Sequence, residues 1–410
     1  MPPVQQITLS SGRLEVSLTV PLDAEVHAPA VDRTTSGVDK VVAALTHPLG
    51  LPSLPQCTVP GDRIVIVADP ETPLVAEMIT QICQLLGETE GSGPAVQLLL
   101  PRDGTGEDWP RLMEELPNSV RRRLAVHVHD PADDTGRGYL ASSAAGDRVY
   151  LNRHLLEADL IITIGTIGFD GLLGYRGTTS VIFPAFSDAE TIREAGGHGH
   201  PELTPEERRP LRDLIDEIGW LLGTQFALQV LPDATGGVAY VFAGLPGDVQ
   251  RAGQEVLDRE WRFVPDRSSD LVVTSVPGSG SVGWKQIGAA LETACRLVRQ
   301  GGRIAVVADA GEPQGAGAAM LRRCAEPEDL LKPLRKEPTE DAVEMTQLIQ
   351  ALRRARVFLL SSLPTEIVED MGLIALGSGA ELQRLINASA SVSVIPGAHL
   401  VWCAVADSVR

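Results

Sequence analysis

The segment Leu160-Ile161-Ile162-Thr163-Ile164 is a nearly unbroken apolar run that leads into a glycine-rich stretch from Gly165 to Gly177. Such a run is typical of a strand in a parallel sheet, because helices cover both faces of that strand. Similar runs occur at residues 63–68, 96–100, 271–276, 303–308 and 356–360, and segments with helical spacing separate them. This alternation predicts an α/β fold with mostly parallel sheets flanked by helices.

The alternation restarts after Phe263-Val264-Pro265-Asp266-Arg267, so the sequence predicts two α/β domains, residues 1–266 and 267–410. Ligands of parallel sheets bind beyond the carboxyl ends of the strands, and the cleft between the domains is the expected site. The other expected strands are 6–9 and 14–20, which form a hairpin, 124–129, 226–231, 238–242 and 400–405. The expected helices are 38–45, 73–86, 109–122, 188–195, 205–222, 246–260, 284–299, 339–354 and 381–386, with a mobile loop within 313–338.

The charge balance excludes partners that need a basic surface. The chain has 35 Lys and Arg against 54 Asp and Glu, a formal net charge of −19. Nucleic acids and anionic membranes attract basic faces, so neither is an expected partner. No apolar run approaches the ~18 residues of a membrane span. The sequence starts without a basic and apolar signal segment, and its cysteines are widely separated, so a location in the cytoplasm is expected.

Two motifs suggest chemistry on weak grounds. Gly278-Ser279-Gly280-Ser281-Val282-Gly283 lies between a strand and a helix, as a phosphate-binding loop does, and the next strand ends at Asp309. The spacing to this acid is longer than the ~20 residues of a dinucleotide site, so a helix-starting turn is the better interpretation. His127 and His129 lie two residues apart on a predicted strand, so they face the same side. They are either a base with its orienting partner or a hydrogen-bonded pair at the end of the strand, and the second interpretation is favoured.

One region resembles a known family. Residues 164–185, IGTIGFDGLLGYRGTTSVIFPA, and residues 186–200, FSDAETIREAGGHGH, are similar to the nucleotide-cofactor loop of the nickel-dependent lactate racemases. Further similarities occur at residues 44–51 (ALTHPLGL), at the ends of the turn 69–73, at residues 210–248 and at residues 284–286. The matching positions in the first region are Gly174, Tyr175, Gly177, Pro184, Thr191 and Ile192.

The resemblance implies a two-domain α/β enzyme that racemises or epimerises α-hydroxy acids. In that family a nickel pincer nucleotide takes hydride from the substrate, a Lys carries the nucleotide covalently, a His binds nickel, and two further His move the hydroxyl proton. The nucleotide contacts that the resemblance indicates here are Gly174, Tyr175, Arg176, Gly177, Thr178, Thr179 and Ser180. The indicated substrate contacts are Thr72, Arg102, Lys285 and Gln286, the base is Asp170, and the metal ligands are His198 and His200.

This sequence departs from the family pattern at nearly every reactive position. Ser180 takes the place of the cofactor Lys and has no amine for the covalent link. Asp170 takes the place of the first base His, and residues 101–106 have no His where the second is expected. An ionised Asp only accepts hydrogen bonds, so it is a poorer proton shuttle than a His. Arg102, Arg176 and Lys285 remain as sources of positive charge for an anion.

Two functions remain open. The first is a divergent lactate racemase-like protein that binds a small anionic or nucleotide-like ligand in the interdomain cleft. Such a protein would be a 2-hydroxy acid racemase or epimerase if its cofactor is held in another way. The second is a non-catalytic homologue that uses the cleft for binding or regulation. A nickel pincer nucleotide bound without a covalent link and no cofactor at all are equally compatible with these substitutions.

Overall fold

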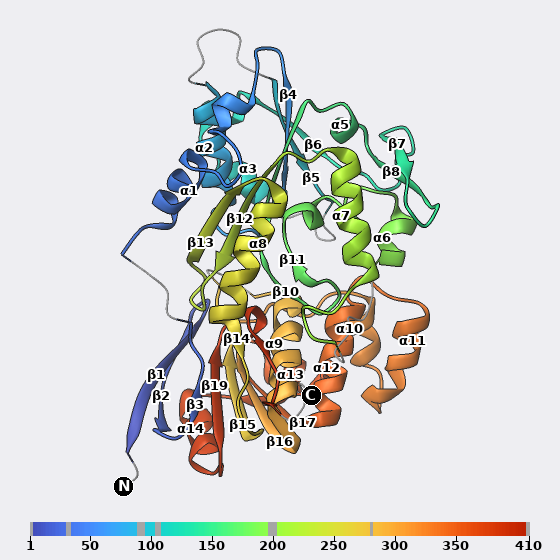
Figure 1. Ribbon diagram of the computed structural model, residues 1–410. Helices are drawn as coiled ribbons and strands as arrows, with labels where there is room; N and C mark the ends of the chain where they lie inside the picture. Colours follow the sequence, from blue (N-terminus) through green and yellow to red (C-terminus); the bar gives the residue numbers. More distant parts are fainter. Residues whose placement is uncertain are drawn as a thin grey trace.

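In the computed structural model, two halves of the chain each build a six-stranded sheet, and one half lies above the other in Figure 1. The structure describes residues 3–29, 34–87, 95–102, 108–195, 203–278 and 282–406. Helices flank both sheets, and all but one of the pairings between neighbouring strands are parallel. The predicted α/β fold is confirmed.

The first sheet has the strand order β13-β12-β9-β4-β5-β6. These strands are β4 (Arg63–Ala68), β5 (Ala95–Leu100), β6 (Leu124–Val128), β9 (Leu160–Thr166), β12 (Phe226–Pro232) and β13 (Val238–Gly244). The helices of this half are α1 (Gly37–Thr46), α2 (Val75–Gly87), α3 (Asp108–Glu115), α4 (Asn118–Arg121), α5 (Arg153–Leu156), α6 (Ala189–Ala195), α7 (Pro210–Leu222) and α8 (Pro246–Val256). Ile64 and Ile66 pack in a cluster with α2, whereas Val65 and Val67 pack with α7, so β4 is buried on both faces as its sequence predicts.

The second sheet has the order β18-β17-β16-β15-β19-β3. Its strands are β3 (Glu25–Val26), β15 (Ser269–Ser275), β16 (Val298–Val307), β17 (Ala355–Leu360), β18 (Ile374–Leu376) and β19 (Val392–Pro396). Its helices are α9 (Trp284–Leu297), α10 (Ala316–Leu321), α11 (Leu331–Lys336), α12 (Ala342–Arg354), α13 (Thr365–Asp370) and α14 (Gly379–Asn387). Ile287 and Leu291 of α9 pack with Leu348 of α12 in the largest apolar cluster, on one face of this sheet.

The N-terminal hairpin, β1 (Val4–Ser11) and β2 (Leu14–Pro21), packs on the second sheet and not on the first. Leu9 and Leu18 share an apolar cluster with Leu271 of β15, and β3 extends the same sheet by pairing with β19. Residues predicted to open the first domain therefore build part of the second half. The domain boundary near residue 266 stays a prediction.

Several predicted elements differ from the structure. The helix expected at 109–122 is two helices, α3 and α4, because Pro117 interrupts the hydrogen-bond pattern between them. The helix expected at 205–222 begins only at Pro210, a residue suited to the first helical position. The segment 313–338, expected to contain a mobile loop, carries α10 and α11.

The last predicted strand, 400–405, is also wrong. Its residues form the end of a 3₁₀ turn, η5 (Ala398–Leu400), and a two-residue strand, β20 (Trp402–Cys403), that pairs with β14 (Arg262–Phe263). The strand that completes the sheet is β19, which precedes them. Another hairpin, β7 (Arg137–Ser142) with β8 (Arg148–Asn152), was not predicted.

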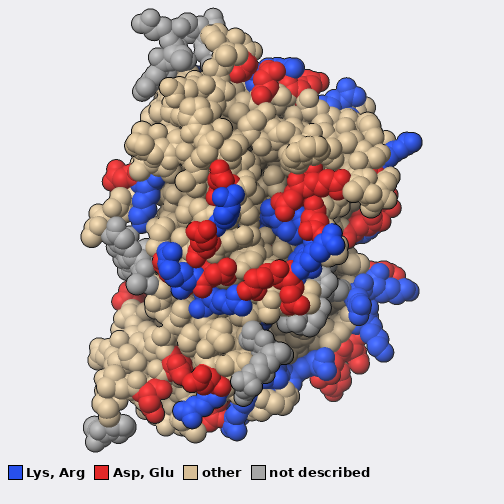
Figure 2. Space-filling view, in the orientation of Figure 1, with Lys and Arg blue, Asp and Glu red and all other residues tan. Residues whose placement is uncertain are grey.

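The surface in Figure 2 mixes charges of both signs. Acidic and basic side chains alternate in a band across the middle of that face, and no extended basic patch interrupts it. Among the described residues, no helix is both long enough and apolar enough to cross a membrane.

Candidate functional site

A cavity of about 1020 Å³ lies where the carboxyl ends of the two sheets meet. The first half contributes the turn after β4, the segment after β9 and the β12–β13 turn; the second half contributes residues after β15, α9, α12 and η5. Strand ends of parallel sheets are the usual ligand sites of α/β proteins, because helix starts and free loops gather there. The cleft that the sequence predicts is therefore present.

Charged side chains of both signs line the cavity, and carboxylates predominate. The cations are Arg111, Arg176 and Lys285. The carboxylates are Asp69, Glu71, Glu77, Glu115, Asp170, Asp233, Glu292, Glu340 and Glu344.

A short hairpin places Asp170 and Arg176 in this cavity. It consists of β10 (Gly168–Asp170) and β11 (Gly174–Arg176). Oδ1 of Asp170 accepts hydrogen bonds of 2.9 Å from the backbone N–H groups of Leu172 and Leu173, which shapes the turn. At the start of β11, position 174 requires a glycine. Its φ is +74°, and a Cβ there would lie 2.3 Å from the carbonyl oxygen of Pro205.

The structure brings together some of the predicted site residues. Thr72, Asp170, Arg176, Lys285 and Gln286 all line the cavity, and they come from both halves of the chain. Arg102 is among the described residues but does not line it. Its guanidinium is exposed and forms an ion pair of 2.8 Å with Asp130. Of the three predicted sources of positive charge, two remain in the site.

The other predicted nucleotide contacts form hydrogen bonds or packing contacts within the protein. Ser180 and the two threonines before it form a 3₁₀ turn, η2 (Thr178–Val181), outside the cavity lining. The Ser180 hydroxyl accepts a hydrogen bond of 2.9 Å from the N–H of Gly177. Thr179 is buried and packs so closely on Gly219 of α7 that a Cβ there would lie 2.2 Å from its methyl group. Tyr175 is buried and bonded to Asp258, and burial raises the pKa of its hydroxyl.

The predicted metal ligands cannot be placed, because His198 and His200 lie outside the described residues. Within the residues that are described, no group of three or more His, Cys, Asp or Glu side chains is arranged to hold a metal ion.

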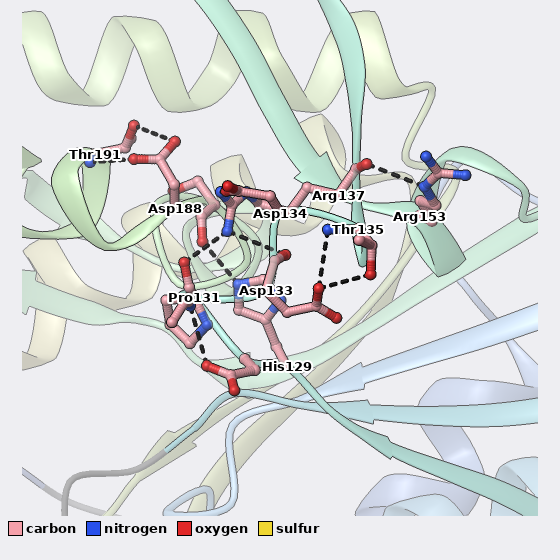
Figure 3. Close-up of polar contacts among 12 residues, drawn as sticks. His129, Pro131, Asp133, Asp134, Thr135, Arg137, Arg153, Asp188 and Thr191 are labelled. Carbon is pink, nitrogen blue, oxygen red and sulfur yellow. Dashed lines mark hydrogen bonds and ion pairs between the residues drawn. The ribbon is translucent and has the colours of Figure 1, made fainter.

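His129 has a structural role, which favours the second of the two predicted interpretations. Its Nε2 lies 2.7 Å from the carbonyl oxygen of Ser187, and its Nδ1 lies 3.0 Å from the Asn152 amide nitrogen. Figure 3 shows His129 beside an acidic loop in which the guanidinium of Arg137 occupies the centre, where it bonds the carbonyl oxygen of Pro131 at 2.6 Å. His127 stacks on His154 with 3.8 Å between ring centroids. Neither His127 nor His129 lines the cavity.

Asp309 also has a structural role, which argues against a dinucleotide at the glycine motif. One carboxylate oxygen accepts from the Ser362 hydroxyl, and the other accepts from the N–H of Arg13 at 3.1 Å. The N–H of Gly12 donates to the carbonyl oxygen of Gly278 at 3.0 Å. The turn of the N-terminal hairpin thus uses the acid that a ribose would need.

The sequence analysis missed His399, which follows β19 and lines the cavity from η5. Gly397, in the left-handed region at φ +67°, turns the chain so that this histidine reaches the cleft. Burial, reinforced by the positive charge of Arg176, lowers the pKa of His399 to about 3. His399 is therefore neutral at pH 7. A correct prediction of β19 would have placed Pro396–Leu400 at a strand end and indicated it.

Among the residues that the structure describes, several buried polar atoms at the cavity have no hydrogen-bond partner. They are Oγ1 of Thr72, Nε of Arg176, Oε1 of Gln286 and Nδ1 of His399. Thr72 is 3% exposed, so water reaches it poorly. Buried polar groups in folded proteins are nearly always paired, and each unpaired group costs about 1–3 kcal/mol. Four of these atoms belong to residues that line this one cavity.

The family cofactor does not fit this site in its covalent form. A lysine-type link needs an amine, and the hydroxyl of Ser180 accepts a hydrogen bond from the backbone N–H of Gly177 in a turn that does not line the cavity. Thr178 and Thr179 are buried in the same turn. Arg176 is the member of this nucleotide-loop turn that both lines the cavity and carries charge.

The fold and the cavity define an α/β protein of two halves with a ligand-sized cavity between their sheets. The family model for the lactate racemase N-terminal domain matches residues 11–204. The chain is 24% identical over 388 residues to the lactate racemase of Thermoanaerobacterium thermosaccharolyticum, a match that covers 87% of this chain and 88% of that protein. This chain is thus a divergent lactate racemase-like protein, as the loop at residues 164–200 predicts.

Solved structures agree with the fold. The lactate racemase apoprotein from T. thermosaccharolyticum superposes with a TM-score of 0.79 at 19% identity, covering 97% of this chain and 100% of that one. A protein from Thermotoga maritima superposes with a TM-score of 0.63 at 16% identity, covering 92% of this chain and 100% of that one. At these identities the structural likeness establishes the architecture.

Proposed function

We propose that this chain binds a small carboxylate in the cavity between its halves. The observation that carries the proposal is the set of unpaired buried atoms on Thr72, Arg176, Gln286 and His399 around one cavity. Arg176 supplies the charge for the carboxylate, since a guanidinium matches its two oxygens. Lys285 adds a second positive charge from the first turn of α9.

The ligand is held without the covalent anchor of the lactate racemases. Ser180 has no amine, and its hydroxyl already accepts the Gly177 N–H. This arrangement favours a protein whose ligand enters and leaves freely over one that carries a permanently attached nucleotide.

Calorimetric titration with lactate, malate and 2-hydroxyglutarate tests the proposal. Arg176→Met removes a charge-assisted contact of about 1.5–3 kcal/mol, so at least one of these acids should bind the variant roughly tenfold or more weakly. Arg111→Met is the matched control, because Arg111 lines the cavity but is exposed and paired with Glu115. Failure of all three acids to bind the unaltered protein, or equal binding by the Arg176 variant, contradicts the proposal.

Isomerisation of a 2-hydroxy acid is the second candidate function. It is favoured by two titratable side chains, Asp170 and His399, that reach the cavity from opposite halves. Chiral analysis of lactate after incubation with protein from its own host measures this activity, and Asp170→Asn should abolish it if Asp170 is the base. Binding without interconversion of the two enantiomers supports the non-catalytic alternative.

A further inference from the structure

The excess of carboxylates in the cavity lining favours a ligand that carries a positive charge in addition to its carboxylate. Nine carboxylates line it against three cations, and His399 is neutral. The whole chain carries a net charge of −19, which adds to the negative potential. A cleft with one dominant sign of charge concentrates ligands of the opposite sign. A simple anion would gain at Arg176 and lose over much of the remaining wall.

Several of these carboxylates are already used inside the protein. Glu292 accepts from Arg296 at 2.9 Å and from Gln347 at 2.6 Å. Asp233 is buried and accepts from the N–H groups of Thr235 and Gly237 in its own turn. These side chains add to the field but have little capacity left for a ligand.

Glu344 is different. It lines the cavity from the first turn of α12 and is half-buried, and within the described part of the chain its carboxylate accepts a hydrogen bond from its own backbone N–H but from no other residue. Burial raises the pKa of Glu344, the Asp341 carboxylate acts in the same direction, and Lys285 opposes them. A carboxyl group held in this way is stabilised as an anion when a cation or strong donor binds to it.

Two further unpaired atoms support a ligand that donates hydrogen bonds. The buried Oε1 of Gln286, on the neighbouring helix α9, is an acceptor without a donor. Thr72 is 3% exposed, and its hydroxyl has no partner although the residue lines the cavity. Gln286 and Glu344 come from α9 and α12 of the second half, whereas Thr72 and the hairpin that carries Arg176 belong to the first half.

We propose that the ligand is amphoteric: its carboxylate lies at Arg176 and its protonated amine lies at Glu344 and Gln286. This inference rests on the proposed binding of a carboxylate and adds the chemical class of the ligand, a small amino acid. A hydroxyl group can satisfy Gln286, whereas a protonated amine also adds positive charge beside Glu344, to which Lys285 already contributes.

Calorimetric titration with matched pairs tests this inference. Each pair differs in one amine: alanine and lactate, glutamate and 2-hydroxyglutarate, 6-aminohexanoate and hexanoate. We expect the amine-bearing member of at least one pair to bind tenfold or more tightly than its partner. Glu344→Gln should remove that preference while leaving binding of the amine-free member within about twofold. Glu77→Gln, which removes the same formal charge from an exposed side chain at the cavity, should keep the preference.

The outcomes separate the two proposals. Amine-free acids that bind as tightly as their amine-bearing partners, or more tightly, overturn the amphoteric ligand and leave the carboxylate site intact. Binding by no member of any pair overturns both. Circular dichroism verifies that Glu344→Gln is folded. If Glu344→Gln does not fold, Gln286→Met, which removes the second acceptor, should reduce the same preference. A preference that neither substitution changes also overturns the inference.

Discussion

The hydroxyl of Tyr175 donates a hydrogen bond of 2.7 Å to Oδ1 of Asp258. Tyr175 directly precedes Arg176 in β11, and Asp258 lies in a π-helical turn, η3 (Leu257–Trp261), that follows α8. Arg212 of α7 reaches the same strand from another side, where its guanidinium lies 3.4 Å from the carbonyl oxygen of Tyr175. The strand that carries Arg176 is therefore held by contacts made outside the cavity.

Replacing Tyr175 with Phe should lower the free energy of unfolding by about 1 kcal/mol, the usual contribution of one hydrogen bond. The loss stays moderate because Asp258 keeps Arg262 nearby, at 3.8 Å. Urea unfolding measures the change. Tyr139→Phe is the control, since its hydroxyl bonds Ser142 on an exposed strand and should change stability by only a few tenths of a kcal/mol. If the free energy of unfolding falls equally in the two variants, the hydrogen bond to Asp258 contributes no more to stability than an exposed one.

Replacing Gly174 with Ala should destabilise the protein by roughly 2 kcal/mol more than replacing Gly223 with Ala. Both glycines have positive φ, +74° and +71°, so each substitution carries the cost of a left-handed residue. A Cβ at position 223 meets open space, whereas one at position 174 approaches the backbone of Pro205 at 2.3 Å. Thermal and urea unfolding compare the two variants directly. The packing argument fails if the variants unfold at the same denaturant concentration.

His399 should make the protein less stable in mild acid. Its pKa is about 3 when folded, against about 6.5 in an unfolded chain. Below pH 6.5 the unfolded chain binds a proton that the folded protein does not, so the free energy of unfolding falls as pH falls toward 3. Between pH 7 and pH 5 the unaltered protein should lose about 2 kcal/mol more than His399→Gln. Parallel stability curves for the two proteins would contradict the neutral buried state of His399.

The protein should carry no covalent nucleotide even when it is produced together with the enzymes that synthesise the lactate racemase cofactor. Ser180 offers a hydroxyl that is bonded to Gly177, where the covalent link needs an amine. Intact-mass spectrometry of the purified chain should give the mass of the polypeptide alone. A mass increase of nucleotide size would refute this expectation.

Much of the fold was predictable because its signals are local. The apolar runs at β4, β9 and β15 have no polar alternation, and their burial on two faces follows from that pattern. β19 was missed because Ser393 interrupts its short apolar run, although Ser393 is buried and its hydroxyl lies 2.8 Å from the Ser269 hydroxyl. A serine that is satisfied by a partner 124 residues away in the sequence gives no local signal.

The site was predictable only in part for a related reason. Alignment with a cofactor loop indicates Arg176 and Ser180 equally, and only the three-dimensional turn separates the one that faces the cavity from the one bonded to Gly177. His399 and Glu344 lie far along the chain from that loop, in segments where no motif indicates a function. Their place in the cavity follows from how the two halves come together around it, which depends on the whole fold.

The docking of β1–β3 on the second sheet makes that half a discontinuous unit, assembled from both ends of the polypeptide. A fragment that begins at residue 267 would uncover the apolar side of β15 and β16 and leave the edge of β19 unpaired. Expression of the C-terminal half alone should consequently give aggregated material, whereas supplying the first 29 residues as a separate peptide should restore solubility. Any engineered split of this protein has to keep its opening hairpin with its closing strands.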